Sequence, residues 1–319
     1  MPFLDIASLS VDYRSSRGTV RAVEDISFSL DKGETLGLAG ESGSGKSTLG
    51  LSIIRLVPHP GIIVKGQIKI EEKNILKLRE QEMRSIRGGK VAYIFQDPMT
   101  SLNPVKKIGV HFVELIRNHE PNTSNKAAQE RAKNVLKNLG ILAERINDYP
   151  HQFSGGMRQR IMIGLAIALN PGLVIADEPT TALDVIVQAK ILDLLEDLRK
   201  IYGMALILIS HDLSIILERC DKIIVMYAGH MVEYATSTEL NRDPKHPYTQ
   251  GLLQSIPNIE LFDQKLSAIP GSPPNMLNPP KGCPFWPRCS HVMEICRVKE
   301  PSLIDVGGNH FVRCFLYSK

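Results

Sequence analysis

The chain has 319 residues, of which 43% are hydrophobic and 23% are charged, and its formal net charge is +4. These proportions are those of a folded globular protein and exclude an intrinsically disordered chain. A transmembrane helix needs about 20 consecutive apolar residues, and the longest apolar run, residues 161–169, is much shorter. The net charge is too small to indicate nucleic acid or an anionic membrane surface as a partner.

Residues 1–5 contain no basic segment followed by an apolar core, so we expect no export signal. The cytoplasm is therefore the expected compartment, and a cytoplasmic chain rarely carries disulfides. We expect none among the five cysteines.

The N-terminal part of the chain is predicted to be rich in strands. The first two strands alternate between apolar and polar side chains, with a turn at residues 15–18 between them. The third is short and apolar and runs directly into a glycine-rich segment, after which a helix ends before Pro58 and Pro60. The expected strands are residues 4–14, 20–30, 34–39, 67–70 and 91–95, and the expected helix is 47–56.

The glycine-rich segment matches G-x-x-x-x-G-K-[ST], the pattern of a phosphate-binding P-loop. Its glycines let successive backbone N–H groups turn inward around phosphate oxygens at the positive end of a helix. Lys46 would reach the β- and γ-phosphates of a nucleotide, and the Ser47 hydroxyl would bind Mg²⁺. The predicted ATP-binding residues here are Gly40, Ser42, Gly43, Ser44, Gly45, Lys46, Ser47 and Thr48.

Residues 108–169 are predicted to be mainly helical, with Ser124 as a helix cap and Gly140 as a helix stop. Near the end of this region, Ser154-Gly155-Gly156 precede an apolar helix at 158–169. Exposed N–H groups at the start of a helix attract anions. The sequence therefore predicts a second anion-binding feature, in a chain whose P-loop already holds its own phosphates.

Two adjacent carboxylates follow an apolar strand at 172–177. Asp177 ends this strand, as the carboxylate that holds Mg²⁺ does in P-loop enzymes. Glu178 is then placed to polarise or deprotonate the attacking water. His211 follows another apolar strand, 204–210, and alone it could be a packing residue. Because the predicted sheet brings it beside the same pocket, we interpret it as a contact to the γ-phosphate.

Strands and helices alternate after residue 172, which predicts an α/β fold with a largely parallel sheet. Composition changes near residues 240–245, where a proline-rich and cysteine-rich tail begins. We expect an ATP-binding domain over 1–243, with a helical subdomain at about 100–168, and a C-terminal extension over 244–319. The other expected elements are helices 185–201 and 212–219 and strand 222–227.

The order of these motifs resembles that of the ATP-binding subunit of an ATP-binding cassette (ABC) transporter, over about residues 3–240. Ser154-Gly155-Gly156-Met157-Arg158 resembles the signature of the family, usually Leu-Ser-Gly-Gly-Gln, although Phe153 and Met157 depart from its commonest spelling. Three further segments resemble the glutamine loop, the aspartate loop and the switch histidine. They are Phe95-Gln96-Asp97-Pro98, Thr181-Ala182-Leu183-Asp184 and His211.

This resemblance implies a P-loop ATPase core with a mixed, largely parallel sheet, an N-terminal antiparallel β subdomain and a helical signature subdomain. It implies that Tyr13 stacks on adenine, although taken alone Tyr13 could be an ordinary strand residue. Gln96 would join Ser47 and Asp177 around Mg²⁺ and couple the site to a membrane subunit. Glu178 and His211 would be the catalytic residues.

In this family the signature docks on the γ-phosphate held by the opposite subunit. One chain carries one P-loop and one signature, so two chains must pair head-to-tail, with Ser154, Gly155 and Gly156 acting on the partner's ATP and Asp184 communicating across the dimer. The resemblance implies a paralogous ATPase as partner, two membrane-spanning permease subunits and, indirectly, an extracytoplasmic solute-binding protein. The expected location is the cytoplasmic side of the cell (inner) membrane, as a peripheral subunit.

The tail resembles the C-terminal extension of dipeptide, oligopeptide and nickel importer ATPases. The resemblance lies in His246-Pro247-Tyr248-Thr249, in residues 269–274 and in Asn278-Pro279-Pro280. It implies ATP-driven uptake of di- or oligopeptides, although nothing in the tail itself binds peptide, so nickel or another small solute stays open. A soluble ATPase acting on nucleic acid is the weaker alternative. Only about a hundred residues, without sustained heptads, separate P-loop and signature, and we expect no nucleic-acid partner.

Four cysteines form the pattern C-x₅-C-x₆-C-x₁₇-C in the tail: Cys283, Cys289, Cys296 and Cys314. Four thiolates suggest a closed tetrahedral metal site or an iron–sulfur cluster. The paired C-x-x-C spacing usual for structural zinc is absent. Some peptide-importer ATPases resemble this pattern and carry a [4Fe–4S] cluster, so we expect one, with zinc or unliganded thiols as alternatives. Cys220 is expected to be a buried structural thiol.

Overall fold

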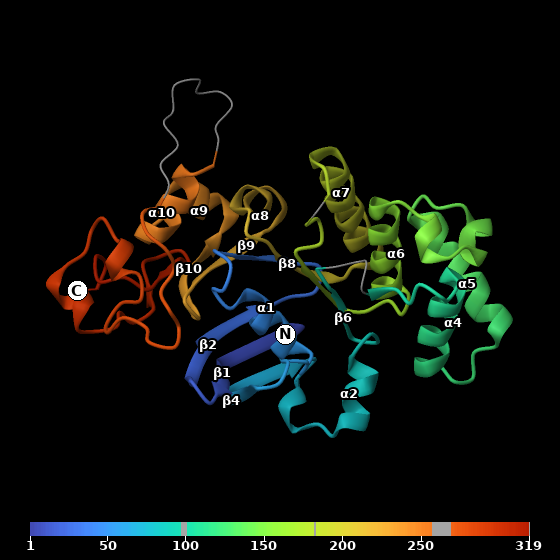
Figure 1. The fold of residues 1–319 in the computed structure, drawn as a ribbon, viewed down its shortest axis with the longest axis horizontal. Coiled ribbons are helices and arrows are strands. Elements are labelled where there is room, and N and C mark those ends of the chain that lie inside the picture. Colours follow the sequence, from blue (N-terminus) through green and yellow to red (C-terminus); the bar gives the residue numbers. More distant parts are fainter. Residues whose placement is uncertain (97–100, 182, 257–268, 319) are drawn as a thin grey trace. The chain divides into compact units, whose positions relative to one another are not determined.

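A computed structural model describes the chain except for residues 97–100, 182, 257–268 and 319 (Figure 1). The chain forms two compact units, each with its own strands and helices. Unit 1 comprises Met1–Leu30, Thr35–Leu76 and Leu208–Lys319, and unit 2 comprises Asp31–Glu34 and Lys77–Ile207.

Unit 1 opens with an antiparallel sheet of strand order β2-β1-β4-β5. The first two strands pair as a hairpin in which Ser15 faces Gly18, as the sequence predicts. β4 pairs with the other edge of β1 and begins at Gly61, earlier than expected. The bounds are β1 (Leu4–Ser15), β2 (Gly18–Leu30), β4 (Gly61–Ile70) and β5 (Lys73–Asn74).

A second sheet in unit 1 has the order β11-β12-β10-β9-β3. β3 is parallel to β9 and all of its residues are buried, which confirms the predicted apolar strand before the P-loop. β10 was not predicted. It follows β9 through Ala228 and Gly229, both at positive φ, which makes a tight hairpin turn. The bounds are β3 (Thr35–Ala39), β9 (Lys222–Tyr227), β10 (His230–Thr236), β11 (Ile304–Asp305) and β12 (Phe311–Val312).

The helices of unit 1 are short. The helix after the P-loop ends at Ile53, before the predicted residue 56, and Arg55 then takes a positive φ of 52°. α8 packs closely on β3, because a Cβ on Gly37 would lie 2.2 Å from the Ile216 side chain. Cys220, directly after α8, is 5% exposed, which confirms the expected buried thiol. The bounds are α1 (Lys46–Ile53), α8 (Leu213–Arg219), α9 (Ser237–Arg242) and α10 (Pro247–Gln254).

In unit 2, the strand order is β8-β7-β6. β6 and β7 are parallel, with Val91 beside Leu173, and every residue of β7 is buried. This arrangement confirms the largely parallel sheet. The bounds are β6 (Val91–Ile94), β7 (Leu173–Asp177) and β8 (Ala205–Ile209), whose C-terminal end belongs to unit 1.

The predicted helical region forms three helices that lie together in unit 2 (Figure 1). Ser124 caps the second of them by accepting a hydrogen bond from the Ala127 N–H at 3.2 Å, and Gly140 follows it at a φ of 71°. A short charged helix, in which only Met83 is buried, was not predicted. The bounds are α2 (Glu80–Ile86), α4 (Ile108–His119), α5 (Asn125–Asn138), α6 (Gly155–Ile167) and α7 (Val185–Tyr202).

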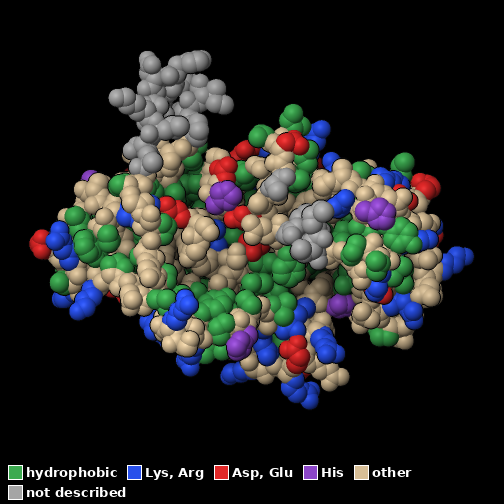
Figure 2. All heavy atoms as spheres, in the orientation of Figure 1, with side chains coloured by type: hydrophobic (Ala, Val, Ile, Leu, Met, Phe, Trp, Pro, Cys, Tyr) green, Lys and Arg blue, Asp and Glu red, His purple; other side chains and the backbone are tan. Residues whose placement is uncertain are grey.

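Charged side chains are dispersed on the face drawn in Figure 2, where Lys and Arg lie scattered with Asp and Glu among them. The net charge of +4 is therefore not gathered into one patch on this face. Among the described residues, no helix combines the length and the apolar character needed to cross a bilayer.

Candidate functional site

The P-loop of unit 1 connects the buried strand β3 to helix α1. Gly45 is the N-cap of α1 with a φ of 106°, and a Cβ there would lie 2.1 Å from the Ala22 carbonyl oxygen. Gly40 has a φ of 142°, and a Cβ there would lie 2.2 Å from the Met226 carbonyl oxygen. Both positions therefore require glycine, because any side chain would clash with backbone atoms.

Lys46 lies within the P-loop. Its Nζ donates to the carbonyl oxygens of Gly40 and Glu41 at 2.7 and 2.9 Å, and its side chain is buried. The Ser44 hydroxyl is 3.4 Å from the same Nζ. Ser47 is exposed in the first turn of α1. The ammonium group and this hydroxyl thus belong to one compact loop at the start of a helix, where anions are favoured.

Unit 1 also holds Tyr13 and His211. The half-buried Tyr13 on β1 places its hydroxyl 3.4 Å from the Thr48 hydroxyl of α1. The Ser210 N–H donates to the Leu38 carbonyl at 3.2 Å, so the exposed His211 follows the strand that ends beside β3. The structure thus gathers Tyr13, the P-loop and His211 in the same compact unit.

In unit 2, Asp177 forms a short hydrogen bond that the sequence did not reveal. The Tyr93 hydroxyl donates to Asp177 Oδ2 at 2.7 Å, and Asp177 is 6% exposed. Burial, with the neighbouring carboxylate, raises the pKa of Tyr93, so the phenol remains protonated and donates. The bond depends on parallel pairing of β6 and β7, whose residues are about eighty positions apart.

The Glu178 carboxylate is held by two side chains. Gln96 Nε2 donates to Glu178 Oε2 at 3.1 Å, and the Thr181 hydroxyl donates to the same oxygen at 2.9 Å. The backbone of Glu178 has a φ of 44°, an unusual value for a non-glycine residue. Gln96 and Glu178 are therefore brought together, while Asp97 and Pro98 of the predicted glutamine loop lie outside the described residues.

The segment that resembles the signature starts helix α6. The Ser154 hydroxyl caps this helix by accepting from the Met157 N–H at 3.4 Å. The Arg145 guanidinium lies 4.0 Å from the centre of the Phe153 ring and 3.7 Å from the Met157 sulfur. Phe153 and Met157, the two residues that differ from the usual signature sequence, therefore both contact Arg145.

Helix α7 begins at the segment that resembles the aspartate loop. Asp184 caps α7 by accepting from the Val187 N–H at 2.9 Å. A Cβ on Gly156 would lie 2.8 Å from the Val187 side chain, so α6 and α7 approach closely at this glycine. Ala182 lies outside the described residues.

The four cysteines of the tail share one small cavity in unit 1, lined in part by Phe285 and Trp286. Burial raises the pKa of Cys283 to about 12 and that of Cys314 to about 11, and it also raises the pKa of Cys289. Repulsion between neighbouring thiolates of the group also raises the pKa of these three cysteines. The structure therefore gathers Cys283, Cys289, Cys296 and Cys314 around one space, as a shared ligand would require.

A buried carboxylate that the sequence analysis missed holds the tail in place. Glu233 of β10 is fully buried and accepts from the N–H groups of Lys245 and His246 at 2.6 and 3.0 Å. The His310 ring lies 2.7 Å from the same carboxylate. Glu233 therefore joins the start of α10 to the turn between β11 and β12.

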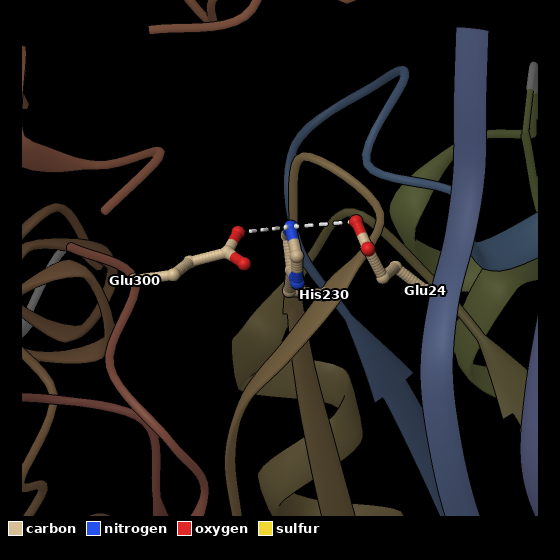
Figure 3. Close-up of side chains that lie close together, drawn as sticks. All are labelled: Glu24, His230 and Glu300. Carbon is tan, nitrogen blue, oxygen red and sulfur yellow. Dashed lines mark ion pairs between the residues drawn. The ribbon is translucent and has the colours of Figure 1, made fainter. Parts of the chain in front are cut away.

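A second charged group, shown in Figure 3, contacts the tail through Glu300. The Nε2 atom of buried His230 lies 3.5 Å from Glu24 and 3.2 Å from Glu300. Carboxylates and imidazole are a ligand set that divalent cations accept, and these three ligand atoms lie within 4.8 Å of one another. Arg21, 2.6 Å from the other oxygen of Glu24, already supplies positive charge there.

Two family matches cover most of the chain. Residues 23–181 match the ABC transporter family. Residues 232–296 match the C-terminal region of oligopeptide/dipeptide transporters. The first match contains the P-loop, the two carboxylates and the signature segment, and the second contains three of the four cysteines.

Curated relatives match along nearly their whole length. The chain is 46% identical to the oligopeptide transport ATP-binding protein OppD of Bacillus subtilis, over 98% of this chain and 88% of that protein. It is also 46% identical to the dipeptide transport ATP-binding protein DppD of Haemophilus influenzae, over 98% and 95%. A solved ATP-binding cassette dimer with bound ADP and Pi is similar at 27% identity and a TM-score of 0.65, over 73% of this chain and 98% of that one.

Proposed function

The chain belongs to the ABC transporter family, and from this membership we propose that it is the ATP-hydrolysing subunit of an importer of di- or oligopeptides. One observation carries the proposal. A single chain joins an ABC cassette to the C-terminal region of oligopeptide/dipeptide transporters. The cassette would hydrolyse ATP, and the match of the tail favours peptides as the transported substrate.

In this proposal, ATP with Mg²⁺ binds at the P-loop. Backbone N–H groups and Lys46 hold the phosphates, because the ammonium already lies within the loop. Ser47, Gln96 and Asp177 hold Mg²⁺. The hydrogen bond from Tyr93 supports the assignment of Asp177, since a neighbouring donor that orients the carboxylate is typical of metal ligands.

Glu178 is the general base that activates the attacking water. Its hydrogen bonds from Gln96 and Thr181 orient the carboxylate before the reaction. His211 contacts the γ-phosphate, and Tyr13 stacks on adenine. The exposure of His211 and the position of Tyr13 beside α1 support these roles.

A complete site needs two chains. Ser154, Gly155 and Gly156 at the start of α6 would dock on ATP held by a second cassette, with Asp184 carrying the signal between subunits. We infer a paralogous ATPase as partner, two membrane-spanning permease subunits and an external solute-binding protein. The chain would then sit on the cytoplasmic side of the cell membrane.

We further propose that the four tail cysteines hold a [4Fe–4S] cluster that stabilises the extension. Four cysteine thiolates are the usual ligand set of such a cluster, and these four cysteines line one cavity. The paired C-x-x-C spacing usual for structural zinc is absent from the tail, so the ligand pattern favours iron–sulfur over zinc.

Metal analysis of anaerobically purified protein tests the cysteine assignment. About four irons with matching acid-labile sulfide per chain are expected, lost in a Cys289→Ser variant but retained in Cys220→Ser, because Cys220 lies away from the cavity. One zinc per chain would replace the cluster with a plain structural metal. A chain with neither metal would contradict both assignments.

Uptake by intact cells tests the transport proposal. A strain lacking this chain should lose uptake of radiolabelled di- and oligopeptides but keep uptake of free amino acids. The wild-type chain should restore peptide uptake, and a Glu178→Gln chain should not. Unchanged peptide uptake with loss of nickel uptake would replace the peptide assignment by the nickel alternative.

A further inference from the structure

The C-terminal extension contacts the P-loop at Glu41. The Arg288 guanidinium forms a bidentate ion pair with this carboxylate, with Nη1–Oε2 and Nη2–Oε1 distances of 2.6 and 2.9 Å. Arg288 is 7% exposed. Paired charges of this geometry are among the stronger polar contacts in proteins, and breaking one leaves an uncompensated buried charge.

The backbone of Glu41 is held from the same side. Its N–H donates to the Tyr248 hydroxyl at 2.8 Å, and Tyr248 is fully buried. Burial raises the pKa of Tyr248, so its hydroxyl stays neutral. Both the side chain and the amide of this P-loop residue are thus fixed by the extension.

Arg288 itself has little freedom to move. Its Nε donates to the Pro270 carbonyl at 2.9 Å, and its guanidinium lies 5.8 Å from the centre of the Tyr227 ring. Tyr227, Tyr248 and Phe285 form a packed aromatic group, with ring centres 4.7 to 5.4 Å apart. The arginine is therefore a rigid support and not a mobile surface side chain.

Glu41 also contacts Lys46 and Ser44, two residues of the P-loop. Its carbonyl oxygen accepts from Lys46 Nζ at 2.9 Å and from the Ser44 N–H at 3.2 Å. A displacement of Glu41 would therefore shift both the Lys46 ammonium and the Ser44 amide within the P-loop. The chain of contacts runs from Arg288 through Glu41 to Lys46.

We propose that Arg288 is a positioning residue for ATP binding, through which the cysteine-containing extension holds the P-loop in its phosphate-binding shape. The inference rests on the proposed ATP site. Because Cys289 directly follows Arg288, the order of the cysteine module and the affinity for nucleotide are linked through this arginine. In this proposal the extension, which matches the C-terminal region of oligopeptide/dipeptide transporters, also supports the nucleotide site.

Equilibrium binding of fluorescent ATP to the full chain tests this role. Arg288→Gln and Glu41→Gln should each raise the dissociation constant about tenfold, equal to about 1.4 kcal/mol. Arg288→Lys should recover part of this loss, because lysine keeps the charge but not the bidentate geometry. The double variant should be no weaker than either single variant, since both remove one ion pair.

Two controls separate positioning from general damage. Arg297→Gln changes an exposed arginine of the same module that lies over the Trp286 ring and should leave ATP affinity unchanged. In Arg288→Gln and Glu41→Gln the defect should appear mainly as a raised KM for ATP and less in kcat, because the ion pair positions the binding loop. Glu41→Gln also tests the ion pair without altering the cysteine module.

The outcomes are distinct for the two proposals. Wild-type protein that does not bind ATP would overturn the proposed function. Wild-type protein that binds ATP, with Arg288→Gln and Glu41→Gln binding equally well, would overturn the positioning role alone. Additive losses in the double variant would also overturn it, because the two residues would then act separately.

Discussion

Residue 178 combines a strained backbone with a fixed side chain. A non-glycine residue in the left-handed region costs about 1–2 kcal/mol, and Glu178 has a φ of 44°. The hydrogen bonds from Gln96 and Thr181 hold its carboxylate in one orientation. Strain of this kind persists where the surroundings over-determine it, which is common at functional sites.

Replacing Glu178 by Gln is expected to keep ATP binding and nearly abolish hydrolysis. Gln preserves the shape and hydrogen-bonding capacity but cannot accept the proton of water, so turnover should fall by about 100-fold or more. Phosphate release and ATP binding, measured on the same preparation, check this. The exposed Glu144→Gln serves as the control. Unchanged turnover in Glu178→Gln would assign the base elsewhere.

Protonation of His230 is expected to destabilise the fold in mild acid. Burial lowers its pKa to about 4, with Arg313 contributing in the same direction, whereas an unfolded histidine titrates near about 6.5. The unfolded chain therefore binds the proton first, and the free energy of unfolding falls as the pH drops from about 6.5 to 4, by about 1–2 kcal/mol at pH 5.

Urea unfolding at pH 7 and pH 5 measures this dependence. The loss of stability between the two values should be smaller in His230→Gln than in the wild type. It should be unchanged in His151→Gln, since His151 is exposed. Equal pH dependence in wild type and His230→Gln would show that His230 does not titrate over this range.

At the scale of elements, the parts of the fold that the sequence predicted carry a local signal. β3 and β7 are fully buried and mostly apolar, and each leads into a motif, while Ser124 and Gly140 bound α5 by ordinary cap chemistry. β10 and α2 were missed because β10 mixes buried polar with apolar residues and α2 buries only Met83. Neither segment has a clear hydrophobic period.

The side-chain partners of the site were the least predictable feature. Arg288 and Glu41 are 247 positions apart, and Tyr93 and Asp177 are 84 apart. Each pair depends on tertiary packing, and no spacing along the chain marks it. Motif residues could be recognised because their chemistry is local, whereas the residues that support them could not.

Gly155 and Gly156 at the start of α6 differ in how closely they approach α7, so replacing each by Ala should affect stability differently. A Cβ on Gly156 would lie 2.8 Å from the stiff Val187 side chain, whereas a Cβ on Gly155 meets nothing closer than Leu183 at 3.8 Å. Gly156→Ala should therefore destabilise the protein by about 1–3 kcal/mol, the usual cost of overpacking. Gly155→Ala should cost little, and denaturant unfolding compares the two. Equal stability of both variants would mean that α7 moves freely away from α6.

At the scale of the whole molecule, the extension is built onto the strands of the cassette. β12 pairs with β10, and Glu233 fixes the start of α10 and His310. Arg288 and Tyr248 then reach the P-loop. The same chain therefore carries the feature that indicates peptide transport and the contacts that shape the ATP site.

ATP-driven peptide uptake in proteoliposomes tests the central claim most directly. The vesicles would contain this chain, its partner ATPase and the two permease subunits, with a binding protein and a labelled peptide on the outside. Peptide should accumulate only when ATP is inside, and a Glu178→Gln chain should prevent accumulation. Steady ATP hydrolysis without peptide accumulation, for peptides of any length, would contradict the account.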